Sequence, residues 1–336
     1  MKKSFLMLGL AVAAMTSCTN DEVVEVNQSN LIKFESFVNK GTRAVTETTT
    51  TGLSQFYVFG GYGTDYINVF NDVAVTFNST DNNWAPVTEA EWTANNYRFA
   101  AYANRNTSEK LSPTFDANGL KFTDYVVSDD KDLVAALSGE VDNSNLANNA
   151  VALTFKHMLS QVKFTFKNTD ASHRMSVSDV TVSNVNNKGT GTLSSNGIAW
   201  TNLVVDNNYA LKYIGTNNVA VNATYAPDYQ MVIPQTLNTS GKEIQITFTI
   251  TFYDNNSAVV STETFNNVSL VYDNDATVGE DNKNFTAWKP GYKYNYTANF
   301  PADPKTIRFT VTEVEEWEEQ TVNGNNGTPG DSQMDF

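Results

Sequence analysis

Hydrophobic and polar side chains alternate with a period of two along most of the chain, which is the pattern of β-strands with one buried face and one solvated face. The cleanest example is 244–253, where Ile and Phe alternate with Gln and Thr. Such stretches recur at close intervals, separated by Asn, Asp and Gly, and this favours an all-β chain of sandwich type over βαβ units. The other predicted strands are 32–38, 53–59, 70–77, 84–92, 97–103, 151–157, 159–166, 177–185, 209–213, 230–233, 257–265, 292–296 and 307–312.

One segment departs from this alternation. Residues 129–139 begin with acidic side chains, place apolar residues three and four apart, and end at Gly139. These are the start and stop signals of a helix, because acidic groups favour its first turn and glycine its end. The sequence therefore predicts few helices, all short, with this one as the clearest.

Two interruptions of the strand pattern have a local cause. Gly60 and Gly61 follow an apolar strand and are expected to end it in a turn. After Thr312, Val314 and Trp317 fall out of the two-residue register, which predicts a bulge or a bend.

The N-terminus carries the features of a secreted lipoprotein. Lys2 and Lys3 precede the apolar run 5–14, which is shorter than the roughly 20 residues of a membrane-spanning helix. Cys18, the single cysteine, follows at the position of a bacterial lipobox cysteine, and lipid chains there would anchor the protein to a membrane. The acidic stretch 19–22 resembles the tag that sends lipoproteins of the Bacteroidetes to the cell surface.

Length and composition then set the domain organisation. At roughly 100 to 200 residues per domain, the 336-residue chain without its signal is long enough for two domains, and 143–149 is a polar connector between them. Aromatic residues make up 12% of the chain, in line with β-structure. We expect a signal peptide at 1–17, a propeptide with a removable first strand at 18–43, β-sandwiches at 44–147 and 148–318, and a mobile tail at 319–336.

The net charge excludes one class of partner. The formal charge is −15, and it becomes −17 when Lys2 and Lys3 leave with the signal peptide. A strongly acidic chain repels phosphate groups and anionic headgroups, so the sequence predicts no binding of nucleic acid.

The first predicted strand is joined to a candidate protease site. Ile32, Phe34 and Val38 form its apolar face, and the basic Arg43 stands before the small Ala44 at the start of a Thr-rich linker. Cleavage between Arg43 and Ala44 would detach the strand and expose unpaired backbone groups beside an apolar groove. Such a groove could accept a replacement strand. The alternative is that Arg43 is an ordinary exposed residue of a linker.

Candidate catalytic and metal-binding residues are few. His157 and His173 lie sixteen residues apart without a cysteine partner, which makes a poor zinc site. Asp129, Asp130 and Asp132 lack the central Gly and the closing Glu of an EF-hand loop. No Gly-x-Ser-x-Gly motif is present. The sequence therefore predicts no enzyme, no metal site and no cofactor.

The tryptophans leave a second function open. Tryptophan rings can stack on sugars, although packing in a sandwich core is their commoner use. A monomeric surface lipoprotein that binds glycans or host ligands is therefore the rival hypothesis. The residues concerned are Trp84, Trp92, Trp200, Trp288 and Trp317.

Several blocks of sequence, taken in order, resemble the fimbrillins, the type V pilus subunits of the Bacteroidales, over nearly the whole chain. Each block alone is weak, but their common order is fairly specific. The blocks are Cys18, Thr42-Arg43-Ala44, ALTFKHMLSQV at 152–162, Val232-Ile233-Pro234-Gln235, WKPGYKY at 288–294 and VEEW at 314–317.

The resemblance implies two tandem transthyretin-like β-sandwich domains and a surface-exposed outer-membrane lipoprotein that assembles into a fimbria. Cys18 would carry the lipid, palmitate included, and Arg43-Ala44 would be the bond cut by an arginine-specific protease. The strand with Ile32, Phe34 and Val38 would be removed. Its partners would be other pilus subunits, the outer membrane through Cys18, and a host or bacterial surface ligand.

The resemblance also implies assembly by donor-strand exchange, in which a C-terminal strand of a neighbouring subunit fills the groove. Ile307, Phe309 and Val311 are the candidate donor residues. The tail beyond Glu318 lacks alternating apolar residues, and this keeps a tip or anchor role open beside a role in the shaft.

Overall fold

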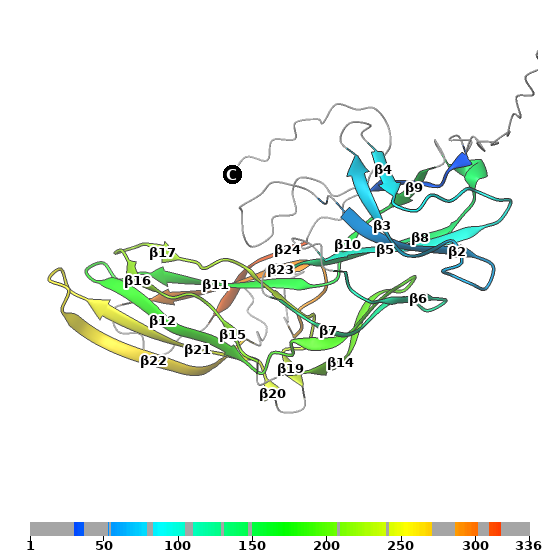
Figure 1. Ribbon diagram of the computed structural model, residues 1–336. Coiled ribbons are helices and arrows are strands. Elements are labelled where there is room, and N and C mark those ends of the chain that lie inside the picture. The colour runs from blue at the N-terminus through cyan, green and yellow to red at the C-terminus, as the bar shows by residue number, and fades with distance from the viewer. Residues whose placement is uncertain are drawn as a thin grey trace, which may run out of the picture.

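The computed structural model describes residues 30–36, 53, 55–78, 83–104, 110–128, 131–146, 150–206, 209–239, 242–270, 286–301 and 309–316. Of these, 63% lie in strands and 1% in helix, so the prediction of an all-β sandwich protein is confirmed. The molecule is elongated (Figure 1). No helix within the described ranges is both long and apolar enough to cross a membrane.

The first sheet has eight strands and wraps round one apolar core. Strands β9 (Ala150–Leu153) and β10 (Lys156–His157) follow each other in the chain but lie at opposite edges of the sheet, so the segment between them joins the two edges. Phe155 in that segment is buried and contacts Phe56, with ring centroids 5.4 Å apart. In spatial order the strands are β10 (Lys156–His157), β8 (Leu133–Val141), β5 (Tyr97–Asn104), β2 (Gln55–Tyr62), β3 (Phe70–Asn78), β4 (Asn83–Pro86), β1 (Lys33–Ser36) and β9 (Ala150–Leu153).

The second half of the molecule contains two sheets that share one core. Their strands alternate as the sequence predicts: in β21 (Gln245–Tyr253) every second side chain is buried, and Phe248 and Phe252 are at most 1% exposed. One sheet contains β17 (Thr224–Tyr225), β11 (Ser160–Asn168), β23 (Tyr292–Phe300) and β24 (Thr310–Glu316), with β18 (Gln230–Val232) also paired to β11. The other contains β15 (Leu211–Lys212), β12 (Arg174–Ser183), β21 (Gln245–Tyr253) and β22 (Val259–Ser269), with β16 (Thr216–Val219) also paired to β12.

A four-stranded sheet joins the two halves. Its strands come from both sides of residue 147, as do those of the first sheet, because β9 and β10 follow that residue. A third core forms where Leu120, Phe122 and Leu193 of this sheet pack with Tyr102 and Met158. Its strands are β14 (Gly197–Val204), β13 (Lys188–Ser194), β7 (Gly119–Val126) and β6 (Thr114–Asp116); the remaining elements are the ribbon of β19 (Asn238–Thr239) and β20 (Lys242–Glu243) and the 3₁₀ helix η2 (Asn143–Asn145).

The prediction of a helix at 129–139 is wrong. Residues from Leu133 onward form strand β8, which pairs with β5 along one edge from Leu133 to Val141 and with β10 along the other edge at Val134 and Ala135. Both faces of β8 are covered in its first four residues, since Val134 belongs to the core of the first sheet and Leu133 to the third core. A strand buried on both faces needs no polar alternation, and its short apolar run cannot be told from a helix by periodicity.

The two predicted interruptions have different outcomes. Gly60 and Gly61 do not end their strand, because β2 continues to Tyr62. Gly60 is required for packing instead: a Cβ atom there would lie 2.4 Å from the ring of Phe99. The predicted bulge is confirmed, because Glu313 faces Asn295 and Val311 faces Tyr296, which leaves Thr312 between them without a register partner.

Candidate functional site: the first strand and its groove

Strand β1 lies between two other strands of the first sheet (Figure 1). It pairs antiparallel with β4, where Phe34 faces Trp84, and parallel with β9, where Phe34 faces Val151. The residues before it are held by backbone hydrogen bonds, since the Ile32 N–H donates to the Ala90 carbonyl at 2.8 Å. The strand is therefore an interior member of the sheet, although it stands at the start of the described chain.

The inward side chains of β1 fill the core. Ile32 is 1% exposed and Phe34 is 2% exposed. The Phe34 ring lies in a cage of three phenylalanines, with centroids 6.1 Å from Phe56, 5.8 Å from Phe70 and 5.6 Å from Phe99. All three pairs meet edge to face, an arrangement worth about 0.5–1.5 kcal/mol per pair beyond the buried area.

Loss of β1 would leave two kinds of unsatisfied surface. Strands β4 and β9 would each lose the strand that they pair with on that side, and unpaired backbone groups recruit another strand. The cage would lose one aromatic side chain, whose burial is worth about 1.5–3 kcal/mol. The groove therefore calls for an extended segment with a large apolar side chain at the Phe34 position.

Strand β24, which contains part of the candidate donor segment, lies at an edge. It pairs with β23 on one side, and no described strand pairs with its other side. Phe309, just before β24, is 5% exposed and lies in a cage of its own: its ring centroid is 5.5 Å from Phe164, 5.9 Å from Phe166 and 5.6 Å from Phe248. Val311 pairs with Tyr296.

Several predicted site residues lie outside the described residues. They are Cys18, Val38, Arg43, Ala44 and Ile307, and the lipidation and cleavage sites therefore stay predictions. Among the predicted groove and donor residues, Ile32, Phe34 and Phe309 are described and buried, while Val311 is described through its backbone.

Sequence reasoning missed a buried polar pair at the closure of the first sheet. His157 Nδ1 lies 2.7 Å from Asp132 Oδ2, and both side chains are nearly inaccessible to water. Next to it, the Met158 N–H donates to the Leu133 carbonyl at 2.8 Å. These contacts hold β10 against the start of β8. The two residues are 25 positions apart, and Asp132 reads as a helix start, so the sequence carries no signal for the pair.

Two buried tyrosines, Tyr294 and Tyr296, accept hydrogen bonds through their hydroxyl groups in the C-terminal core. The Trp288 indole N–H donates to the Tyr296 hydroxyl at 2.9 Å, and the Lys289 N–H donates to the Tyr294 hydroxyl at 2.8 Å. Burial raises the pKa of Tyr294 to about 12, and it raises the pKa of Tyr296 further above its ordinary value. Both phenols are therefore neutral at physiological pH.

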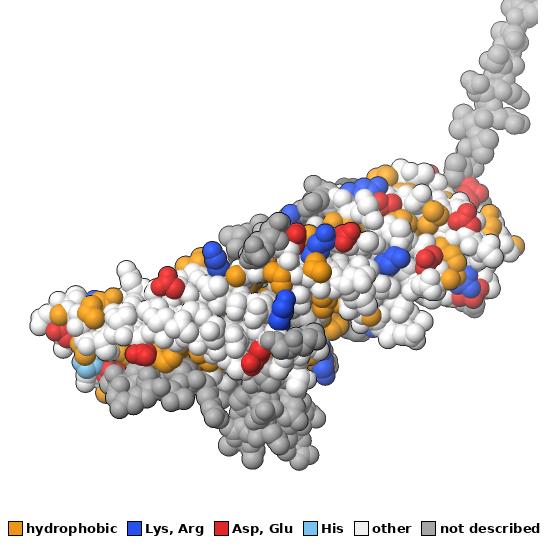
Figure 2. Space-filling model, turned by 90° about the horizontal axis from the view of Figure 1, so that it is seen from below, with side chains coloured by type: hydrophobic (Ala, Val, Ile, Leu, Met, Phe, Trp, Pro, Cys, Tyr) orange, Lys and Arg blue, Asp and Glu red, His pale blue; other side chains and the backbone are white. Residues whose placement is uncertain are grey.

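The described tryptophans do not form a flat surface platform. Trp84, Trp92 and Trp288 are buried, and the half-buried Trp200 packs on Tyr125. On the face seen in Figure 2, hydrophobic side chains occur in small groups among polar and charged ones. Across the described ranges, no three His, Cys, Asp or Glu side chains gather as metal ligands would.

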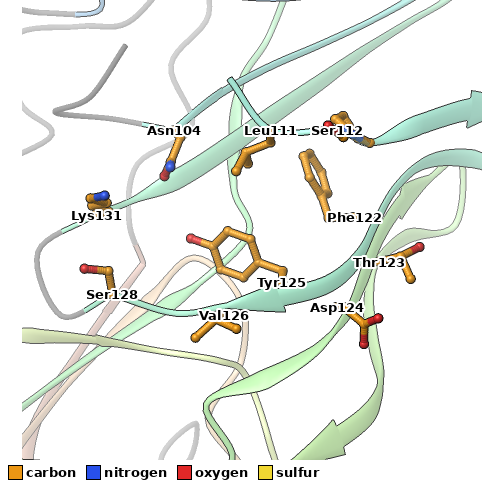
Figure 3. Close-up of a pocket in the computed structure, with 11 residues that line it drawn as sticks. Asn104, Leu111, Ser112, Phe122, Thr123, Asp124, Tyr125, Val126, Ser128 and Lys131 are labelled. Carbon is orange, nitrogen blue, oxygen red and sulfur yellow. The ribbon is translucent and has the colours of Figure 1, made fainter. Parts of the chain in front are cut away.

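One hollow could hold a small molecule. Its volume is about 330 Å³, near the lower end of ligand sites. Figure 3 shows the Tyr125 ring in it, with Asn104, Ser128 and Lys131 on the side of its hydroxyl. Amide, hydroxyl and ammonium groups line this hollow beside the tyrosine, a chemistry that suits a polar molecule such as a sugar.

The comparison with protein families decides the identity of the chain. The model of the fimbrillin-like family matches residues 42–317. The chain belongs to the fimbrillin-like family. This membership confirms the predicted function, a subunit of a fimbria, with other pilus subunits as its partners and the cell surface as its location. No curated protein matches this fimbrillin-like chain.

One solved structure agrees with the fold of this fimbrillin-like protein at a TM-score above 0.5, and two others are similar at lower scores. A fimbrial protein from Bacteroides vulgatus superposes with a TM-score of 0.59 at 15% identity, covering 86% of this chain and 100% of that one. A fimbrilin from Porphyromonas gingivalis gives a TM-score of 0.48 at 11% identity, over 85% and 97% of the two chains. The fimbrial anchor protein Mfa2 from the same organism gives 0.33 at 11% identity, over 87% and 99%.

Proposed function

We propose that this fimbrillin-like protein is a non-enzymatic structural or adhesive pilus subunit that is exported as an outer-membrane lipoprotein through Cys18, cut between Arg43 and Ala44, and assembled by donor-strand exchange. The observation that carries the proposal is the position of β1, an interior strand of the sheet that stands ahead of the proposed cleavage site. Cleavage there would turn a complete sheet into one that needs a strand from another molecule.

The free energy of strand insertion supports a stable contact between subunits. A replacement strand that buries several apolar side chains gains about 1.5–3 kcal/mol for each, and each ladder hydrogen bond adds about 0.5–1.5 kcal/mol net. Ordering the incoming segment subtracts from this sum. Strand addition is an established mode of recognition, in which backbone bonds supply affinity and alternate side chains supply specificity.

The test uses the lipid-free precursor, which begins at Thr19, and trypsin in limiting amounts. Cleavage at Arg43 should be followed by oligomers that resist mild SDS and form a ladder on a gel. The matched control, Arg43→Ala, should stay uncut at that bond and monomeric under the same conditions. A cut protein that remains monomeric would contradict assembly by strand exchange.

Lipidation has a separate test. Wild-type protein expressed in a host that acylates lipoproteins should incorporate labelled palmitate and sediment with outer membranes, and Cys18→Ser should do neither. Equal labelling of the two proteins would overturn the anchoring part of the proposal and leave the assembly part standing.

The second candidate function is glycan binding, and the hollow beside Tyr125 favours it. If the protein were a monomeric glycan binder, it would bind a sugar column without cleavage. Tyr125→Ala would abolish that binding, whereas Phe77→Ala, at an exposed phenylalanine of another strand, would not. A protein that forms ladders and retains no sugar would exclude this candidate.

A further inference from the structure

The hollow described above is built from stretches of chain that belong to two different sheets (Figure 3). Asn104, the last residue of β5, lines it from the first sheet, and residues 122–126 of β7 line it from the four-stranded sheet. Residues 111–113, which lead into β6, form a further wall, and Ser128 and Lys131 lie on the side of the Tyr125 hydroxyl. Separate parts of the chain therefore converge on one small volume.

Asn104 carries a polar group that the fold leaves unsatisfied. The residue is 6% exposed, and its carboxamide oxygen has no hydrogen-bond partner in the described part of the chain. The large majority of buried polar atoms do have a partner, because a buried acceptor without one costs free energy. Figure 3 shows the carboxamide on the same side of the hollow as the Tyr125 hydroxyl. A molecule there that donates a hydrogen bond to Asn104 would remove this cost.

One wall of the hollow is held in place by contacts outside it. The Tyr102 hydroxyl lies 2.9 Å from the Leu111 carbonyl oxygen and 2.9 Å from a carboxylate oxygen of Asp72. Lys110 Nζ lies 3.1 Å from the other carboxylate oxygen of Asp72. These contacts fix the start of the wall formed by residues 111–113.

The opposite wall is held in the same way. The Tyr125 ring packs on Trp200, with ring centroids 5.8 Å apart, and the Trp200 indole N–H donates to the Met158 carbonyl at 2.7 Å. Two residues after Tyr125, the Val127 N–H donates to the Asn187 carbonyl at 2.8 Å. A site whose walls are already fixed loses little free energy to ordering when a ligand binds.

The lining groups indicate a neutral, hydroxylated ligand. The described lining residues include one carboxylate, Asp124, and one ammonium group, Lys131, so the hollow does not favour an ion of either sign. The Asn104 carboxamide presents a donor and an acceptor side by side. This pair matches two neighbouring hydroxyls of a sugar ring, and the volume of about 330 Å³ suits a small ligand such as one sugar unit.

We propose that the hollow binds one monosaccharide unit of a glycan, and that Asn104 recognises it through two neighbouring ring hydroxyls. One hydroxyl donates to Asn104 Oδ1, and the other accepts from Asn104 Nδ2. The inference rests on the second candidate function, glycan binding, and adds to it the residue and the part of the sugar that decide binding. It does not require a monomer, so an assembled pilus subunit can use the same site for adhesion.

Binding is measured on the uncut lipid-free precursor, so that the result does not depend on cleavage or on strand exchange. The probes are the methyl α-glycosides of mannose, glucose and galactose at millimolar concentration, observed by saturation-transfer NMR. At least one should receive saturation from the protein, and a titration then gives its dissociation constant. Absence of transfer to all three would show that solvent alone fills the hollow and would overturn the inference, while the ladder test of assembly would stand unaffected.

The role of Asn104 is tested with Asn104→Leu, which removes the carboxamide and keeps a side chain of similar length. Loss of two hydrogen bonds should raise the dissociation constant of the bound glycoside about tenfold. The matched control, Asn299→Leu, changes an exposed asparagine of strand β23 and should leave the dissociation constant unchanged. Equal affinity of Asn104→Leu and the wild type would overturn the assignment of the site and leave glycan binding at another place standing.

Thermal unfolding separates recognition from a structural role. Because the buried Asn104 oxygen has no partner in the described chain, Asn104→Leu should not lower the unfolding midpoint of the free protein. The bound glycoside should raise the midpoint of the wild type and not that of Asn104→Leu. A midpoint of Asn104→Leu several degrees below that of the wild type would show that the carboxamide serves the fold, and would overturn the inference.

Discussion

The first and last described strands of this protein are placed in opposite ways. β1 lies inside its sheet with a strand on each side, while β24 lies at an edge with one described neighbour. Both are associated with a phenylalanine held by three others, so their packing is similar although their backbone pairing differs.

The difference shows which strand suits which role. Loss of an interior strand leaves two unpaired edges and a groove, whereas departure of an edge strand exposes one edge. Under the proposed cleavage, release of β1 would therefore open two strand edges, whereas β24 pairs with a single described strand. Two predictions test this contrast, and two more concern polar contacts in the two halves of the molecule.

The largest effect is expected from Phe34→Ala. Removal of the caged ring should lower the free energy of unfolding of the uncleaved precursor by about 3–5 kcal/mol, because the cage cannot close around the cavity. Urea denaturation measures it, and Lys33→Ala, at a partly exposed neighbour, should change it by at most about 0.5 kcal/mol. Similar values for the two variants would mean that β1 is not part of the cooperative core.

Phe309→Ala should act on the other half and more locally. We expect the free energy needed to separate β24 from β23 to fall by about 3 kcal/mol, since an edge strand can separate while the rest of the core stays folded. Hydrogen exchange should therefore speed up in β23 and β24 and stay unchanged in β4 and β9. Faster exchange throughout both halves would contradict the idea that β24 leaves independently.

A smaller effect is expected at the closure of the first sheet. His157→Phe keeps the side chain large but leaves the buried Asp132 carboxyl without this partner, which should cost about 1–3 kcal/mol. The double variant His157→Phe with Asp132→Leu should recover part of the loss, because both polar groups are then gone. A double variant that is no more stable than the single one would show that the pair is not the source of the effect.

The smallest effect at neutral pH concerns the tyrosines, which are protonated there in both the folded and unfolded states. Because burial raises the pKa of Tyr294 from 10.0 to about 12, and that of Tyr296 as well, the unfolded chain loses these protons first. The contribution of these two phenols to the free energy of unfolding should be fully present below pH 10 and should fall as the pH rises toward 12. Denaturation of the wild type and of Tyr294→Phe at pH 8 and 11 measures it; equal pH dependence of the two would exclude Tyr294 as a cause.

Much of the local structure could be predicted from the sequence. Strands with one solvent-exposed face, such as β21, are recognised by the alternation of polar and apolar residues. The bulge at Thr312 in β24 is predicted by a break in the same kind of alternation. The first half of strand β8 could not be recognised, because both of its faces are buried and the residues that cover it come from distant parts of the chain.

In the candidate site, too, one part could be predicted from the sequence and another part could not. Ile32 and Phe34 are recognisable as one apolar face of a strand. Their neighbours are not, because Phe56, Phe70 and Phe99 come from three different strands, and nothing in the chain order places β1 between β4 and β9. The Asp132–His157 pair likewise exists only where β8 and β10 meet.

The amino-acid pattern alone indicates the all-β class, the apolar faces of most strands and, through its ordered blocks, the likeness to the fimbrillins. The folded protein adds that β1 is interior and β24 lies at an edge, and that each half surrounds a phenylalanine with three others. These features are not visible in the pattern because alternation records which face of a strand is buried, whereas strand order and packing partners depend on contacts between residues far apart in the chain.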